Sequence, residues 1–189
     1  MLRALLAAGC VTLGVNAQVI PRLKQPDVRY VPTPPSVVEA MLALARVTSA
    51  DIVYDLGSGD GRIPIAAATL HGARGVGIEI DPFYLREARD NAHKANVAGR
   101  VRFLNQDFFE TDIREATVVT LFLLPQVNER LAPKLRRELR PGTRIVSLQY
   151  GMGEEWPAEE SEDVGGLVIY LWTIGNRERE PSGERSPLG

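Results

Sequence analysis

Residues 51–81, DIVYDLGSGDGRIPIAAATLHGARGVGIEID, decide the fold of this 189-residue chain. The stretch predicts a buried strand around residues 52–54, a turn with three glycines, a helix, and a second short strand that ends in an acid. A strand that leads into a helix through glycines can present backbone N–H groups to a ligand at the positive end of that helix. Glu79, at the tip of the second strand, is placed to accept both hydroxyls of a ribose. The pattern therefore predicts a site for a nucleoside cofactor.

The spacing of the glycines indicates which cofactor binds. Gly57, Gly59 and Gly61 follow G-x-G-x-G, whereas dinucleotide folds use G-x-G-x-x-G, and Asp55 precedes them at the strand end. An acid there repels a pyrophosphate but pairs with the ammonium or sulfonium of an amino-acid cofactor. The G-x-K-[ST] run of phosphate loops is missing from the sequence. These features predict S-adenosylmethionine, although the glycines alone are also consistent with a tight turn that binds nothing.

The composition is that of an ordinary soluble globular domain, with 44 % hydrophobic and 24 % charged residues. The net charge of −2 gives no indication of an obligate nucleic-acid partner. Cys10 is the only cysteine, which excludes an internal disulfide and a cysteine metal cluster. His71 lies at a predicted helix end and His93 on a charged helix face, so we expect neither catalysis by histidine nor a metal site.

The first 20 residues differ from the rest of the chain. Arg3, an apolar run over residues 4–15 and small residues up to Ala17 are typical of a signal peptide cleaved after Ala17. Two alternatives stay open: Gly9-Cys10 resembles a lipoprotein cleavage site, and residues 4–20 are just long enough for an uncleaved anchor. Three basic residues follow the segment, which favours a cytoplasmic domain. Residues 1–20 therefore predict either export or membrane association of a bacterial protein.

Alternating strand and helix patterns continue along the chain. Residues 31–35 hold three prolines and predict extended backbone, followed by a helix over residues 37–45 that Ser36 or Thr33 caps. Asp81-Pro82 predicts the start of another helix. The remaining predicted elements are strands over residues 101–105, 117–124, 143–150 and 166–174, and a helix that follows residues 125–128 and ends at residues 140–142.

This order of elements predicts an α/β fold, doubly wound, with a mainly parallel sheet and helices on both faces. No helix fits between the last two long strands, so we expect the final strand to be antiparallel, with residues 154–164 a connection or a weak edge strand. The predicted domain spans residues 28–175. The tail over residues 176–189 is charged and nearly free of apolar residues, and we expect it to be disordered.

With the glycine run, Glu79, and Asp107 at the end of the third strand, residues 30–174 resemble the class I methyltransferases that use S-adenosylmethionine. The resemblance implies a Rossmann-like sheet of seven strands. It also implies that the glycine loop meets the methionine part of the cofactor, Glu79 the ribose, and Asp107 the adenine amino group. The implied cofactor-binding residues are Tyr30, Thr33, Asp55, Gly57, Ser58, Gly59, Glu79, Ile80, Asp107 and Phe108.

A narrower likeness lies in Tyr30-Val31-Pro32, residues 55–63 and Pro125-Gln126. These resemble the lysine methyltransferases of the ATP-synthase c-subunit and the adenine nucleotide translocase, and their bacterial relatives. The resemblance implies N-methylation of a protein lysine. Enzymes that methylate amides carry an Asn/Asp-Pro-Pro-aromatic run after the fourth strand, where this chain has Leu124-Pro125-Gln126-Val127. The alternatives are a small-molecule methyltransferase, a non-catalytic cofactor-binding or scaffold protein, and a nicotinamide-dependent dehydrogenase, which the glycine spacing disfavours.

A lysine acceptor must lose a proton before its nitrogen can attack a methyl group. Burial of the amine among aromatic and carbonyl groups lowers its pKa, so no strong base is required. Gln126, Asn128 and Tyr30 are the residues predicted to surround the acceptor, together with Tyr150.

We expect the mass of the mature protein to distinguish the alternatives for residues 1–20. A chain that begins at Gln18 indicates cleavage after Ala17, and a full-length chain in the membrane fraction indicates an anchor. Intact mass spectrometry of both fractions checks this, and a full-length product in the soluble fraction contradicts both interpretations.

Overall fold

The computed structural model describes residues 30–175, so the predicted N-terminal segment and the predicted tail lie outside the described residues. Within the described range, no helix is both long enough and apolar enough to cross a membrane. The elements in chain order are α1 (Pro35–Leu44), β1 (Ile52–Leu56), α2 (Arg62–His71), β2 (Arg74–Glu79), α3 (Pro82–Lys94), β3 (Val101–Asn105), β4 (Val118–Leu121), α4 (Pro125–Glu138), β5 (Arg144–Leu148), β6 (Glu160–Val164) and β7 (Leu167–Thr173).

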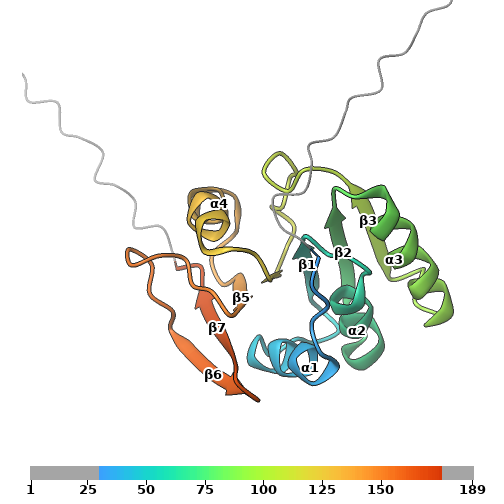
Figure 1. The fold of residues 1–189 in the computed structure, drawn as a ribbon, viewed down its shortest axis with the longest axis horizontal. Helices are drawn as coiled ribbons and strands as arrows, with labels where there is room; N and C mark the ends of the chain where they lie inside the picture. The colour runs from blue at the N-terminus through green and yellow to red at the C-terminus, as the bar shows by residue number, and fades with distance from the viewer. Residues whose placement is uncertain (1–29, 176–189) are drawn as a thin grey trace, which may run out of the picture.

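The strands of this domain form one seven-stranded sheet in the order β3-β2-β1-β4-β5-β7-β6 (Figure 1). The pairs among β1 to β5 are parallel, whereas β7 runs antiparallel to both β5 and β6. The predicted fold class is confirmed, including the antiparallel close, and the weak edge strand is β6. The order in which the chain adds strands to the sheet reverses between β1 and β4. In open sheets of this kind, ligands bind outside the C-terminal ends of the strands at such a reversal.

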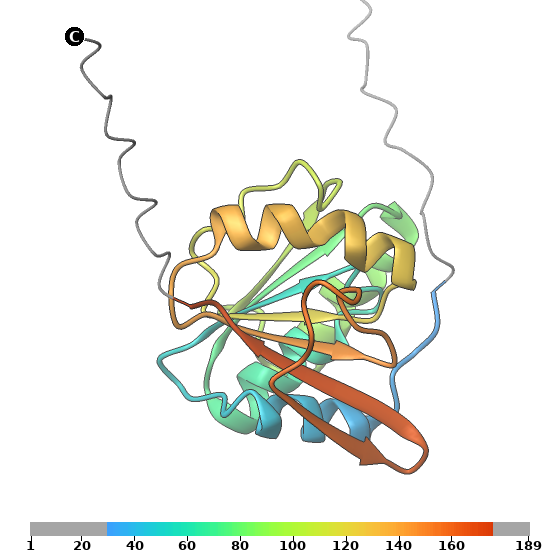
Figure 2. The same cartoon turned by 90° about the vertical axis from the view of Figure 1, so that its left-hand side faces the viewer.

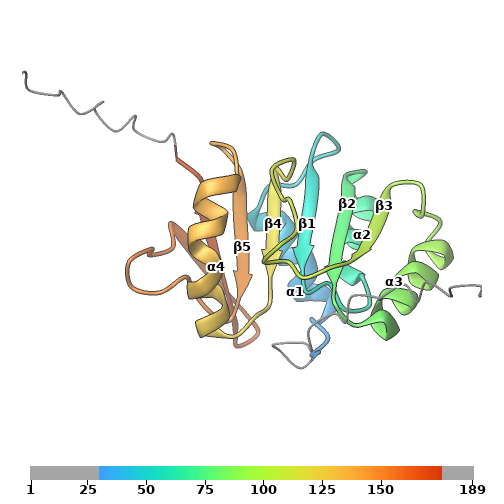
Figure 3. The same cartoon turned by 90° about the horizontal axis from the view of Figure 1, so that it is seen from above.

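Helices cover the two faces of the sheet unevenly (Figures 2 and 3). On one face, apolar residues of α1 and α2 pack against Val53, Val118 and Val146, and α3 packs beside α2 against β3. On the other face, α4 packs its leucines against Tyr54 and Leu121. The expected alternation of strands and helices fails between β3 and β4, where a loop connects the strands and buries its own apolar residues in the same core as α4.

The helix starts follow from local chemistry. Asp81 caps α3 as predicted, since its side chain accepts a hydrogen bond from a backbone N–H in the first turn. The prediction that Ser36 or Thr33 caps α1 is wrong, because Pro34 occupies that position and no side chain caps the helix. Pro35 follows at the first helical position, where the missing N–H of proline leaves no hydrogen bond unmade.

Asp51 ties together the starts of three strands. Its carboxylate accepts hydrogen bonds from Thr117 Oγ1 and the Thr48 backbone N–H, both at 2.7 Å, and pairs with the Arg144 guanidinium. Arg144 also donates to the carbonyl of Ala45 at 2.6 Å. Burial by itself raises the pKa of Asp51, but the hydrogen bonds from the threonines and the charge of Arg144 lower it below its ordinary value. Because these residues begin β1, β4 and β5, one carboxylate fixes the relative positions of the three strands.

We expect Arg144→Met to lower the free energy of unfolding by about 2–3 kcal/mol, because it leaves the buried Asp51 carboxylate without its cation. The pKa of Asp51 is depressed in the folded state, so this contribution is present at neutral pH and is lost as the pH falls below about 4. Urea denaturation at several pH values measures both effects.

Arg46→Met is the matched control, because Arg46 pairs with Glu160 in solvent, with side chains 73 % and 49 % exposed. Removal of such a pair is expected to cost at most about 1 kcal/mol. Equal losses in the two variants would contradict the assignment of Asp51 as the tie between the strands.

Candidate functional site

A cleft opens at the C-terminal ends of β1, β2 and β4, with about 910 Å³ of empty space including its mouth. The extended segment before α1, the glycine loop, the start of α3 and the loop after β3 also contribute to its walls. All of the predicted cofactor-binding residues except Gly59 line this cleft: Tyr30, Thr33, Asp55, Gly57, Ser58, Glu79, Ile80, Asp107 and Phe108. Residues more than 70 positions apart in the sequence therefore meet where the order of the strands reverses.

The Glu79 carboxylate is buried at the end of β2 and joins two parts of the cleft. One of its oxygens accepts a hydrogen bond from the Gly59 N–H and the other from the Asp81 N–H, both at 2.8 Å. These bonds hold the glycine loop and the start of α3 against β2. Each carboxylate oxygen has a second lone pair, so Glu79 can still accept hydrogen bonds from two hydroxyl groups.

The expectation that the glycine loop presents free N–H groups is wrong for most of the loop. The N–H groups of Gly57 and Ser58 both donate to the carbonyl of Ile78, at 2.9 and 3.0 Å. The N–H of Gly59 is bonded to Glu79, and that of Gly61 to the carbonyl of Ser58. These loop N–H groups are therefore hydrogen-bonded within the protein, and the role of the glycines is to give the loop the conformation that shapes the cleft.

Gly59 is required by both its conformation and its neighbour. Its φ of 49° is left-handed, and a Cβ atom at this position would lie 2.2 Å from Cε2 of Tyr30. The Tyr30 ring packs directly over the loop and lies 4.3 Å from the ring of Tyr84, measured between centroids. Tyr30 thus covers one side of the cleft from the segment before α1.

Arg62 fastens that segment to the glycine loop. Its guanidinium donates to the carbonyl of Thr33 at 2.6 Å and to the hydroxyl of Tyr30 at 3.2 Å, and pairs with Asp60 at 2.7 Å. Burial and the nearby charge of Asp60 raise the pKa of Tyr30 to about 12. The phenol is therefore neutral at physiological pH, where it can form hydrogen bonds but does not act as a base.

Asp55 is the buried acid of the cleft. Its Oδ1 accepts a hydrogen bond from Thr120 Oγ1 at 2.7 Å, and its side chain is otherwise shielded from water. Burial raises the pKa of Asp55 to about 7, against the effect of the Thr120 hydrogen bond, and the charges of Glu79 and Asp60 add to the rise. A cation placed in the cleft would favour the ionised form of this carboxyl group.

The lining of the cleft that residues 30–175 provide is acidic. Within that range its only basic lining residue is Arg62, which is already paired with Asp60. The carboxyl groups that line it are those of Asp55, Asp60, Glu79, Asp81 and Asp107. Such a lining attracts cationic ligands and repels phosphate groups.

The residues predicted to surround a methyl acceptor lie in different environments. Tyr30 lines the cleft, whereas Gln126 is exposed in the first turn of α4 and does not line it. Asn128 is 0 % exposed and does not line the cleft either. Its Nδ2 donates to Ser147 Oγ at 3.2 Å and to the carbonyl oxygen of Tyr150 at 3.1 Å, so this amide holds the start of α4 against the chain that follows β5.

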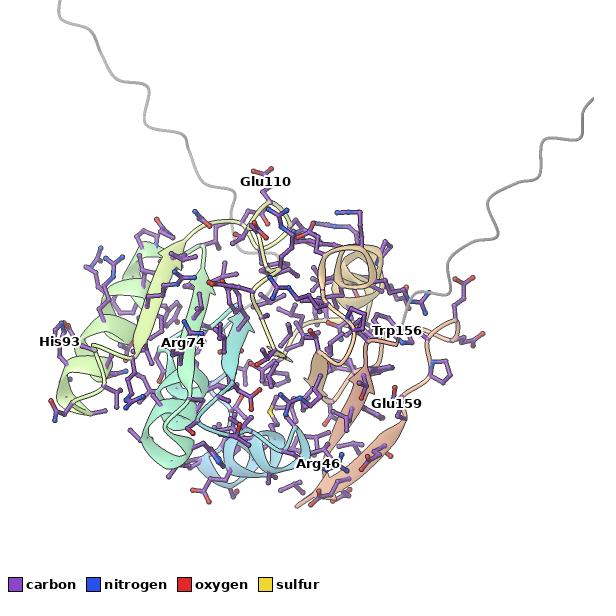
Figure 4. The ribbon with its side chains drawn as sticks, turned by 180° about the vertical axis from the view of Figure 1, so that it is seen from behind. Arg46, Arg74, His93, Glu110, Trp156 and Glu159 are labelled. Atoms are coloured by element: carbon purple, nitrogen blue, oxygen red, sulfur yellow. The ribbon has the colours of Figure 1, made fainter. Side chains whose placement is uncertain are left out.

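The loop after β3 forms the wall of the cleft that faces α4. Figure 4 shows Glu110 at the outer end of this loop. The Arg130 guanidinium of α4 lies 3.7 Å from the centroid of the Phe109 ring, and Phe109 packs against Phe108, which lines the cleft. This cation–π contact couples the wall to α4.

The sequence predicted neither a catalytic histidine nor a metal site. His71 ends α2, and His93 lies on α3, at the outer edge of the domain in Figure 4. Neither lines the cleft. Among residues 30–175, no group of His, Cys, Asp or Glu side chains is arranged to hold a metal ion.

The sequence missed several residues of the cleft. Asp60 and Arg62 carried a local signal, since they flank the last glycine of the loop with a spacing that allows an ion pair. Tyr84, Phe122 and Leu123 also line the cleft, but only the folding of distant segments against each other brings them there.

Comparison with known proteins places these features in context. Residues 55–160 match the family model of the ANTKMT methyltransferase domain. The chain is 48 % identical to a protein-lysine N-methyltransferase of Saccharolobus islandicus over 157 residues, which cover 81 % of this chain and 98 % of that protein. It is 33 % identical to the lysine N-methyltransferase of the ATP-synthase c-subunit from Xenopus laevis, covering 83 % of this chain and 68 % of the relative.

A solved structure with a different description is also similar. It is the crystal structure of an RNA methyltransferase from Salinibacter ruber in complex with S-adenosyl-L-homocysteine. The two chains are 54 % identical, with a TM-score of 0.77, and the match covers 82 % of this chain and all of the other. The relatives thus share a domain but are described with different methyl acceptors.

Proposed function

Because the chain belongs to the ANTKMT family of methyltransferases, we propose that it transfers a methyl group from S-adenosylmethionine to the side-chain amine of a protein lysine. The observation that carries this proposal is the near full-length likeness to the archaeal protein-lysine N-methyltransferase. The acidic cleft supports it, because both the cationic cofactor and the lysine are favoured by negative charge.

The residues of the cleft fit this cofactor. Glu79 would bind the ribose hydroxyls with its remaining lone pairs, and Asp107 with Phe108 would hold the adenine. Asp55 would face the charged methionine part, where a cation offsets the cost of ionising a buried carboxyl group. When bound, S-adenosylmethionine supplies a methyl group attached to a sulfonium, which an amine lone pair can attack.

The protein's own contribution to the transfer is alignment and desolvation. The lining residues have no histidine, and Tyr30 is held neutral by its raised pKa. The acidic lining favours the ammonium form, so the proton is lost once burial and the positive charge of the bound cofactor together lower the pKa of the lysine, after which Tyr30 and Gln126 orient the amine. Gln126 would do so as an exposed amide in the first turn of α4, outside the lining of the cleft, and Asn128 holds the start of that helix from within the core.

RNA is the second candidate acceptor, because the similar Salinibacter structure is described as an RNA methyltransferase. RNA binding requires basic surface to neutralise phosphates. Among the described residues, the cleft instead has five lining carboxyl groups and one arginine that is already paired, and the whole chain carries a net charge of −2. These charges favour lysine over RNA.

We expect the purified full-length protein to form methyl-lysine. The test incubates it with cofactor labelled in the methyl group and, in separate reactions, an array of single-lysine peptides, soluble and membrane proteins, and ribosomal RNA. Hydrolysis and chromatography then identify the labelled product. Label in nucleotides, carboxylates, hydroxyls or a small molecule, with none in lysine, would refute the proposal.

Glu79→Gln is the matched control for this experiment, because it keeps the shape of the side chain but has only one acceptor oxygen for two backbone donors and two hydroxyls. It is expected to lose cofactor affinity by about 10-fold or more. Label that persists unchanged with this variant would come from a contaminating enzyme.

We further expect the affinity for S-adenosylmethionine to fall roughly tenfold between pH 7.5 and pH 6.0. The pKa of Asp55 is about 7 without ligand, and the cationic methionine part lowers it on binding, so below pH 7 binding must remove a proton. Calorimetry at both pH values measures this. Asp55→Asn, which cannot ionise, should bind more weakly and with little dependence on pH. A parent protein whose affinity is the same at both pH values would show that Asp55 does not meet the cation.

A further inference from the structure

Three side-chain oxygens in the described domain are buried without a hydrogen-bond partner there: Ser58 Oγ, Asn128 Oδ1 and Gln149 Oε1. Ser58 and Gln149 directly follow the C-terminal ends of β1 and β5, and Asn128 lies near the start of α4, the helix after β4. Buried polar atoms in proteins are nearly always paired, so each exception calls for an explanation. Ser58 lines the cleft and belongs to the cofactor site already described. Asn128, on α4, and Gln149, directly after β5, are left, and neither is among the residues that line the cleft.

Gln149 does not line the cleft, but strand register indicates that it lies near one lining residue. The last pair of β4 with β5 is Leu121 opposite Ser147. Continued two residues past that pair, the register would bring Gln149 level with Leu123, which lines the cleft. Gln149 is half-buried, so its side chain lies near the surface at this edge of the sheet.

The backbone of Gln149 is strained. Its φ of 70° is left-handed, as are those of two other non-glycine residues in the described range, Arg46 and Asn96. Arg46 and Asn96 directly follow the C-caps of α1 and α3, where a left-handed residue commonly ends a helix. Gln149 follows a strand, so no helix end explains its conformation. Strained residues that the surrounding structure holds in place are concentrated at functional sites.

The neighbours of Gln149 hold it in this conformation. Its N–H donates to the carbonyl of Val168 at 2.7 Å. The carbonyl of the next residue, Tyr150, accepts hydrogen bonds from Ser147 Oγ at 2.7 Å and Asn128 Nδ2 at 3.1 Å. Hydrogen bonds therefore hold the backbone of Gln149 and of the next residue in place. The side-chain oxygen of Gln149 has no polar partner among the described residues.

The orientation of the Asn128 amide is fixed by its partners. Nδ2 faces the carbonyl oxygens of Tyr150 and Gly151, which can only accept hydrogen bonds. Oδ1 must then face the other way, and it has no partner among the described residues. Asn128 Oδ1 thus points into the core, away from the chain that follows β5, and the unpartnered oxygen on that chain is Gln149 Oε1.

We propose that Gln149 is a positioning residue for the methyl-accepting lysine, and that its side-chain oxygen accepts an N–H bond of the incoming amine. The inference rests on the proposed function and specifies the part of the site that holds the acceptor. A neutral lysine amine has two N–H bonds and one lone pair, so acceptors for its hydrogens fix the direction of the lone pair. The amine nitrogen forms a bond to the methyl carbon with that pair, the sulfur keeps the pair of the breaking C–S bond, and the methylated ammonium later releases one proton to water.

Gln149→Met tests the proposal, because methionine has a similar volume and backbone preference but no acceptor oxygen. We expect kcat/KM for the best lysine peptide of the array to fall about 10- to 100-fold. The affinity for S-adenosylmethionine and the melting temperature should stay the same or rise, since the substitution removes an unpaired buried oxygen. Gln149→Glu keeps an acceptor oxygen and is expected to recover part of the lost activity.

Asn96→Met is the matched control, because it changes another left-handed residue that lies at the end of α3 and does not line the cleft. It is expected to lower the melting temperature and leave kcat/KM unchanged. A loss of activity in this variant equal to that in Gln149→Met would show that backbone strain, and not the amide oxygen, causes the effect.

The outcomes separate this inference from the function on which it rests. If the parent protein methylates RNA and no lysine, both are wrong. If the parent methylates lysine and Gln149→Met is equally active, only the inference fails. It also fails if Gln149→Met loses cofactor affinity or stability in step with activity, or if Gln149→Glu folds and binds cofactor but recovers nothing.

Discussion

The cleft depends on the two hydrogen bonds that the Glu79 carboxylate accepts from Gly59 and Asp81. They extend the pairing of β1 with β2 beyond the strands, because the carbonyl of Ile78 already accepts the N–H groups of Gly57 and Ser58. The backbone N–H groups of Gly57, Ser58 and Gly59 are thus hydrogen-bonded within the protein before any ligand binds. A loop held this way is rigid and open, so cofactor binding does not need to order it, and the energy of binding is not spent on that ordering.

The same carboxylates give the cleft a charge that suits a cationic methyl donor. Burial makes ionisation of Asp55 costly without a ligand, and the neighbouring charges of Glu79 and Asp60 add to that cost. A sulfonium would offset it, whereas the thioether left after methyl transfer has no such charge. Under the proposed function, the cleft would therefore favour the donor over the spent cofactor, which helps product release.

The sequence predicted the parts that depend on local pattern. The fold class, the antiparallel β7 and the family likeness follow from glycine spacing, strand ends and the missing helix before β7, and the structure and comparisons confirm them. The pairing of the loop N–H groups depends on the register of β1 against β2, which no local pattern reveals. The meeting of Tyr30 with Tyr84 depends on tertiary packing, and the left-handed Gln149 has no glycine or asparagine to signal it.

The point where the strand order reverses divides the cleft into two halves, and these halves are built from different kinds of segment. The half for the cofactor is built from strand ends, a tightly bonded loop and the start of the loop after β3, whereas α4 and the loop after β5 lie on the other side. Loops can change with little effect on a sheet, since they lie at the surface and carry few of its hydrogen bonds. Relatives that share the sheet can therefore be described with lysine or RNA as acceptor. The acceptor must then be argued from the residues of that second half, among which Gln149 has a side-chain oxygen without a partner in the described domain.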